Sequence, residues 1–260
     1  MKRKILSSIM ALVMIVSMLP FSVFAEEGDT WAESASTEWY TGDGDEYTIS
    51  SAADLAGLAQ LVNGGNDFSG KTIKIGTDID LEGKEWTPIG TKDYPFKGTF
   101  DGTKEEDSTY TISNLKIDDT ELTYAGLFGN LNTPGAIKNL TIQNAQVTGK
   151  ASVGALAGSA FTGSVSGCTV MGLIVISGNY KVGGLAGEGY AKVENCAVIG
   201  DDGSSVTGIY EKYNLEGDNV GGLIGYRGEG NGILTTNCKV ENLTISGVRK
   251  VGGLIGSAFT

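Results

Sequence analysis

Histidine is absent from this 260-residue sequence. Zinc sites of the H-E-x-x-H type, Ser-His-Asp triads and Cys-His pairs all depend on histidine, as do most transition-metal sites. The sequence therefore excludes these catalytic arrangements for this chain. It also contains no nucleotide-binding loop, because its glycines are not followed by a helix or a GK[ST] signature.

Basic residues are scarce. The chain has 19 Lys and Arg against 31 Asp and Glu, and three of the basic residues lie within the first four positions. Beyond that segment the only arginines are Arg227 and Arg249. Nucleic acids and anionic membranes bind clustered Lys and Arg, so we expect neither as a partner.

Long apolar runs are absent after residue 19. The single run, residues 5–19, follows the basic Lys2-Arg3-Lys4 and precedes the small-residue pattern Val23-Phe24-Ala25. This order predicts a signal peptide over residues 1–25, cleaved after Ala25. A transmembrane anchor is the alternative, but the run is short and Pro20 interrupts it. We therefore expect a secreted or cell-surface protein with no membrane insertion after signal cleavage.

Cysteine is limited to Cys168, Cys196 and Cys238. An odd number in an exported chain raises the question of disulfides. However, each cysteine occupies the same phase of a repeat, at the position where the preceding repeat has Leu140. We therefore interpret the three as buried thiols in one column, used as small apolar side chains. A disulfide between neighbouring strands is the alternative.

Glycine, by contrast, is abundant, with 40 residues. Residues 182–187 read V-G-G-L-A-G, and related copies lie at 124–129, 153–158, 220–225 and 251–256. Their final glycines are Gly129, Gly158, Gly187, Gly225 and Gly256, at steps of 29, 29, 38 and 31 residues. A period of this size indicates stacked units that bury their apolar sides against one another.

Each unit divides into three short segments with alternating apolar residues, which predicts three strands per turn. The fold class that follows is all-β, a right-handed parallel β-helix of roughly triangular section. A propeller blade or a leucine-rich repeat fits the spacing less well. We assign the motif to packing, with its leucines inside and its glycines at close backbone approaches. The motif residues are Gly126, Leu127, Gly129, Leu156, Gly158, Gly184, Leu185, Gly187, Gly222, Leu223, Gly225, Gly253, Leu254 and Gly256.

One helix is expected before the repeats. Leu55, Leu58, Ala59 and Val62 share a helical face, and Ser51 with Asp54 forms a capping box. We predict that this helix caps the N-terminal end of the stack. The resulting domains are an acidic linker or frayed arm over residues 26–46, the cap helix and irregular first turns over 47–123, and the repeats over 124–260.

Candidate sites are few. The 38-residue step indicates an insertion at about residues 201–219, a surface loop whose candidate binding residues are Tyr210, Glu211, Tyr213 and Asp218. A loop without any partner is the alternative. If Ile79 points inward, Asp78 and Asp80 both point outward, and Asp101 could lie nearby. Such carboxylates could hold calcium or catalyse glycan cleavage, but no calcium motif supports this, and we expect no cofactor.

The repeats resemble the GLUG-motif repeat of exported bacterial surface proteins, which include adhesins and the non-catalytic part of immunoglobulin-A-specific metalloendopeptidases. Residues 78–81, 86–90, 96–102, 112–115 and 126–129 are similar to the leader that accompanies such repeats, so the resemblance covers about residues 47–260. It implies a surface β-helix and carries over no activity or ligand.

We therefore expect a non-enzymatic adhesion or interaction module for a host or extracellular macromolecule or glycan. A polysaccharide lyase or hydrolase, and the non-catalytic fragment of a larger surface protease, are the alternatives. Because the sequence stops four residues into a further unit, we also expect it to be truncated.

Overall fold

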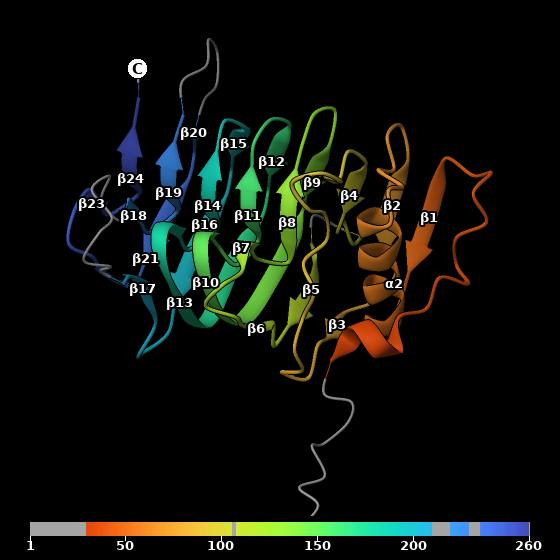
Figure 1. Cartoon of the computed structure of the whole chain (residues 1–260), viewed down its shortest axis with the longest axis horizontal. Helices are drawn as coiled ribbons and strands as arrows, with labels where there is room; N and C mark the ends of the chain where they lie inside the picture. Colours follow the sequence, from red (N-terminus) through yellow and green to blue (C-terminus); the bar gives the residue numbers. More distant parts are fainter. Residues whose placement is uncertain (1–29, 106–107, 210–218, 229–234, 260) are drawn as a thin grey trace, which may run out of the picture.

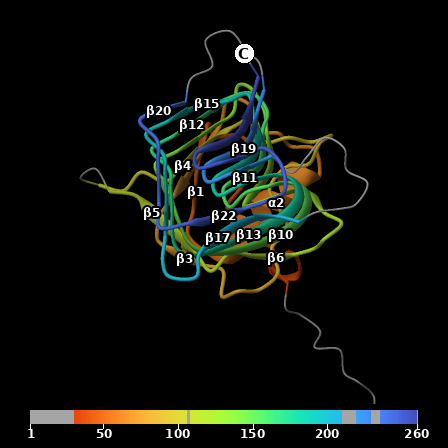
Figure 2. The same ribbon diagram turned by 90° about the vertical axis from the view of Figure 1, so that its left-hand side faces the viewer.

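The structure, a computed structural model, describes residues 30–105, 108–209, 219–228 and 235–259. In these residues the chain winds into a parallel β-solenoid, as the sequence predicts. Three sheets run along its long axis, and each turn of the chain adds strands to them in order (Figure 1). Seen from the end, the successive turns superimpose around one interior (Figure 2).

The three sheets take one or more strands from each turn. The first is β1 (Glu46–Ile49), β2 (Thr72–Ile75), β4 (Thr99–Asp101), β9 (Ala136–Lys138), β12 (Ser164–Ser166), β15 (Lys192–Glu194) and β20 (Thr235–Thr236). The second, the β13 sheet, contains β3 (Ile79–Asp80), β5 (Tyr110–Ser113), β6 (Lys116–Asp118), β7 (Thr123–Ala125), β10 (Leu140–Val153), β13 (Thr169–Gly183), β16 (Ala197–Gly200), β17 (Ser205–Gly208), β18 (Val220–Gly221), β21 (Lys239–Glu241), β22 (Thr244–Ser246) and β23 (Val251–Gly252). The third is β8 (Phe128–Leu131), β11 (Ala157–Ala160), β14 (Ala186–Gly189), β19 (Ile224–Arg227) and β24 (Ile255–Ala258).

Stacking in register produces the core. Val153 pairs with Val182, Val182 with Val220, and Val220 with Val251, so equivalent motif residues lie directly above one another. The motif leucines Leu127, Leu156, Leu185 and Leu223 are all fully buried. Burying one such leucine is worth about 1.5–3 kcal/mol, which makes the columns the main source of stability.

The motif glycines are required by space rather than by a left-handed backbone, and each position has its own neighbour. A Cβ on the first glycine, as at Gly183, would lie within 3.0 Å of a carbonyl in its own turn. A Cβ on the second glycine, as at Gly184 and Gly222, would meet a carbonyl of the next turn at that range. A Cβ on the third, as at Gly187, would meet backbone of the preceding turn.

The corners of the solenoid are formed by residues with positive φ that stack from turn to turn. One corner holds Asn139, Asn195 and Asn237, with φ of 54°, 54° and 52°, and Gly167 fills the equivalent place in the turn between the first two. Asparagine tolerates the left-handed region because its short side chain bonds locally. Asn237 Nδ2 also donates to Asn195 Oδ1 at 3.2 Å, which links two turns.

Helix α2 (Ala52–Asn63) lies at the N-terminal end of the stack (Figure 1). Its N-cap Ser51 accepts a hydrogen bond from Asp54 N at 3.0 Å, and Gly65, with φ of 106°, supplies the left-handed exit. The face carrying Leu55, Leu58 and Val62 is fully buried. The helix therefore shields apolar residues at the end of the stack.

The segment before the helix corrects the expectation of a frayed arm. Thr30 bridges to Glu85, and η1 (Trp31–Ser34) follows. Trp31 Nε1 donates to Leu81 O at 2.8 Å, and the Trp39 ring stacks 6.1 Å from that of Phe68. These aromatic side chains cover the end of the core, so the described part of this segment belongs to the cap.

The cysteines are free thiols in one column, at adjacent turns of the β13 sheet. Cys168 and Cys196 are fully buried, and Cys238 is half-buried in the last described turn. A hydrogen bond with Cys196, together with burial, raises the pKa of the Cys168 thiol.

Thiol labelling should reflect this burial. In the folded protein we expect Cys168 and Cys196 to react with Ellman's reagent at least about 100-fold more slowly than after denaturation, because reaction requires the stack to open. Cys238 should react before the other two. Three thiols should be titrated in denaturant without reductant; a count of one would contradict free thiols.

Candidate functional site

The candidate loop is shorter than the sequence suggested. Gly178 pairs with Gly208, 30 residues later, whereas Val182 pairs with Val220, 38 residues later. The additional residues therefore lie between Gly208 and Val220, and residues 201–208 form an ordinary part of the turn. The predicted binding residues Tyr210, Glu211, Tyr213 and Asp218 lie outside the described residues.

The turn at residues 201–204 is fixed from beneath by Ser204. This buried hydroxyl accepts hydrogen bonds from Ile174 N at 3.1 Å and Asp201 N at 3.0 Å, and it donates to Gly172 O at 3.2 Å. One turn earlier, Asn144 Oδ1 plays a similar part by accepting from Leu173 N at 3.0 Å. The side chains of Asp201 and Asp202 are thus exposed on a rigid support.

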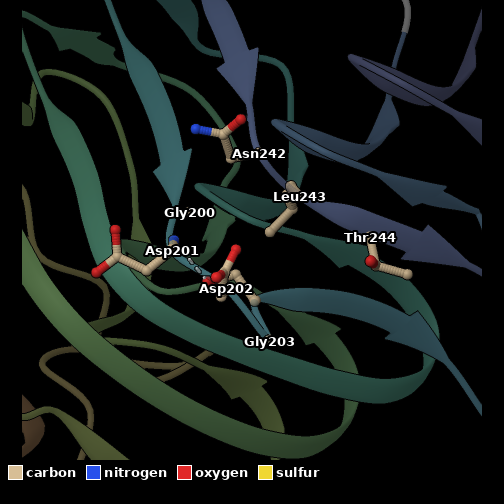
Figure 3. Close-up of a pocket in the computed structure, with 8 residues that line it drawn as sticks. Gly200, Asp201, Asp202, Gly203, Asn242, Leu243 and Thr244 are labelled. Atoms are coloured by element: carbon tan, nitrogen blue, oxygen red, sulfur yellow. Dashed lines mark hydrogen bonds between the residues drawn. The ribbon is translucent and has the colours of Figure 1, made fainter.

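A cleft of about 770 Å³ lies between this turn and the next turn of the chain. Figure 3 shows the side chains of Asp201 and Asp202 on one side and those of Asn242, Leu243 and Thr244 on the other. Carboxylate, amide and hydroxyl oxygens dominate this lining, so the cleft can accept hydrogen bonds from a hydroxyl-rich or amine-bearing ligand. Among the described residues, no group of three or more His, Cys, Asp or Glu could hold a metal ion.

Three apolar side chains are exposed beside the cleft on strand β13. Met171, Leu173 and Val175 keep 38%, 39% and 37% of their surface accessible. They alternate with buried residues, so they project from the same outer face. A Cβ placed at Gly203 would lie 3.8 Å from Leu173 Cδ1, which puts Leu173 next to the acidic turn. Single exposed apolar residues are ordinary, but three neighbours on one strand form a patch.

We call this combined surface the β13 face. It consists of Met171, Leu173 and Val175 together with the cleft residues Asp201, Asp202, Asn242 and Thr244. The sequence indicated the acidic turn only as part of an insertion. The signal that could have identified the patch is that both alternating sets of residues in 170–176 are free of polar side chains, whereas a strand with one face in solvent ordinarily carries polar residues on that face.

The outward carboxylates singled out from the sequence are held by structural hydrogen bonds. Ile79 is buried, and Asp78 and Asp80 are exposed on either side of it. Asp78 Oδ1 accepts from Thr111 N at 2.8 Å, and Asp80 Oδ1 accepts from Glu82 N at 2.8 Å and Asn114 Nδ2 at 2.8 Å. The bonds from Glu82 and Asn114 lower the pKa of Asp80.

Asp101 lies in a different sheet from Asp78 and Asp80. Burial raises the pKa of its carboxyl, but hydrogen bonds from Thr103 and Lys138 outweigh burial, and the pKa is lowered. Lys138 Nζ lies 3.0 Å from Asp101 Oδ2. A general acid in glycan cleavage needs a raised pKa, so neither Asp80 nor Asp101 is suited to that role.

A buried ion pair that the sequence did not indicate joins Lys181 to Glu188 where strands β13 and β14 meet. Ser152 Oγ donates to Glu188 Oε1 at 3.0 Å, and Lys181 Nζ lies 4.7 Å from the centre of the Tyr226 ring. Burial and the Glu188 charge raise the pKa of Tyr124 beside them. Both charges are partnered, so we assign this cluster to holding the corner.

Comparisons with known proteins support the fold and leave the family open. No family model matches the chain. It is 35% identical over 157 residues to halomucin of Haloquadratum walsbyi, covering 55% of this chain and 2% of halomucin. It is 31% identical over 117 residues to a provisionally named Gly-rich membrane protein of Evansella cellulosilytica, covering 44% and 13%. The chain thus spans a small part of both relatives.

A solved structure has a similar fold. The crystal structure of a provisionally assigned immunoglobulin A1 protease from Bacteroides ovatus superimposes with a TM-score of 0.61 and 23% identity, covering 83% of this chain and 62% of that one. At this identity the likeness concerns the fold alone. In the described part of the present chain, no helix is both long and apolar enough to cross a bilayer.

Proposed function

We propose that the chain is a non-catalytic, exported binding module of the GLUG-repeat type that holds an extracellular macromolecule on the β13 face. The observation that carries the proposal is the apolar patch of Met171, Leu173 and Val175 beside an acceptor-rich cleft. Stacked parallel strands provide a rigid support, so little ordering entropy opposes binding there.

The chemistry of the face favours a neutral or cationic glycan, or a glycoprotein that carries one. Sugar rings present apolar C–H faces that Leu173 and Met171 can cover, and hydroxyls that Asp201, Asp202 and Asn242 can accept from. Residues after the predicted signal peptide carry 16 basic and 31 acidic side chains, which disfavours sulfated and uronic glycans by repulsion.

The relatives are compatible with a place at the cell surface. One is named halomucin, another a membrane protein, and the fold neighbour an immunoglobulin A1 protease. We infer that this chain corresponds to a non-catalytic part of such proteins, because it lacks histidine and its Asp80 and Asp101 carboxyls are engaged in structural bonds.

Binding should depend on the apolar patch. Residues 26–260 should bind one or more members of a glycan and matrix-protein array, and Leu173→Asp should weaken that binding by about tenfold or more, because it places a charge in the contact. Ser164→Asp, at a partly exposed position on the outer side of β12, is the matched control and should bind as wild type does. Equal binding by Leu173→Asp would remove the β13 face from consideration.

A further inference from the structure

The C-terminal end of the solenoid differs from its N-terminal end in leaving core positions exposed. Val251 and Leu254 keep 43% and 36% of their surface accessible, whereas the equivalent Val220 and Leu223 are fully buried. Val240, Leu243 and Ile245 of the same turn are also only partly buried. Among the described strands, β20, β21 and β24 end their sheets, and β22 and β23 each pair on one side only.

Gly253 indicates what this end is shaped to receive. A Cβ at Gly126, Gly184 or Gly222 would lie within 3.0 Å of the carbonyl oxygen of the next turn, so these glycines admit a neighbouring backbone. Gly253 occupies the same motif position, but a Cβ placed there would meet nothing within 4 Å, so the space for a further backbone is open. Ala155 holds this position in the second copy, which shows that a methyl group alone is accommodated.

We propose that this end is a docking surface for a second copy of the chain, which approaches with its own C-terminal end. Exposed strand edges and apolar core positions together make a self-complementary surface for strand addition. The N-terminal end cannot take the same role, because α2 and η1 cover it. The contact is therefore isologous and closes as a two-fold dimer rather than extending into a filament.

Charge permits this arrangement. Residues 235–259 contain one carboxylate, Glu241, and three basic side chains, Lys239, Arg249 and Lys250, although the chain as a whole is strongly acidic. Lys239 is paired with Glu241 at 3.3 Å. Two such ends carry little charge of one sign, and physiological salt screens what remains.

Sedimentation velocity of residues 26–260 from about 1 to 100 µM, the range in which modest interfaces assemble, tests the proposal. Wild type should shift from monomer to dimer. Gly253→Val should raise the dimer dissociation constant by about tenfold or more, since its side chain occupies the space for the partner's backbone. Its circular dichroism and its melting at about 1 µM, the low end of that range, should match those of monomeric wild type, because the valine meets nothing in its own chain.

Thr244→Val, an outward-facing change in the same turn, is the control and should dimerise normally. Dimerisation that is lost in Gly253→Val and kept in Thr244→Val supports the proposal. A monomeric wild type throughout the range, an unchanged dimer in Gly253→Val, or growth into larger assemblies would each overturn it.

Discussion

Leu185→Asp should unfold the central turns of the solenoid. Leu185 is fully buried in a column between Leu156 and Leu223, and its replacement removes an apolar side chain and buries a charge without a partner. The lost packing alone costs about 2–5 kcal/mol, and the buried charge adds to it. Because whole domains are stable by only about 5–15 kcal/mol, the strand signal in circular dichroism should fall sharply at about 25 °C.

Leu173→Asp is the matched control. It makes the same chemical change on a neighbouring turn, but Leu173 projects from the outer face and keeps 39% of its surface accessible. Its free energy of unfolding should stay within about 0.5 kcal/mol of wild type. Equal melting of wild type and Leu185→Asp would show that the motif leucine is not inside the stack.

Gly187→Ala should destabilise the protein by about 1–3 kcal/mol or more. A Cβ at this position would lie within 3.0 Å of backbone atoms of Ser152, Val153 and Lys181, none of which can move without displacing a turn. Thermal melting should show a decrease of several degrees, at about 2–4 °C per kcal/mol for a domain of this size.

Gly253→Ala provides the comparison for Gly187→Ala. It introduces the same methyl group into the same motif, where nothing lies within 4 Å, so its melting temperature should equal that of wild type. If Gly187→Ala melted as Gly253→Ala does, close approach of backbone between turns would not be the reason for the motif glycines.

The repeat could be predicted from the sequence because it is a local and periodic signal. Each copy of the motif presents the same valine and leucine at the same phase, and alternation fixes which of them point inward. The cap helix was predictable for a similar reason, since Leu55, Leu58 and Val62 follow a helical period and Ser51 precedes them.

The features that the sequence did not yield depend on contacts between turns. Asn139 and Asn195 each look like an isolated turn residue until stacking aligns them in one corner. Lys181 and Glu188 meet only because the motif between them bends the chain back along itself. Trp31 and Trp39 follow no period, and their partners Leu81 and Phe68 lie far along the chain.

The candidate site was predictable only in outline. The 38-residue step indicated an insertion, but its position between Gly208 and Val220 follows from strand register, which spacing alone does not define. The cleft required two turns to be placed side by side. Its lining from residues 200–204 and 242–244 therefore emerged only in the folded structure.

Binding without chemical transformation of the ligand is the central expectation for this solenoid. The most direct measurement is to incubate residues 26–260 with a panel of host and plant glycans and with immunoglobulin A1, with and without calcium, and to examine the products by mass spectrometry. We predict that every substrate is recovered intact. New reducing ends, unsaturated sugars or cleaved immunoglobulin would contradict this expectation and assign the chain a catalytic role.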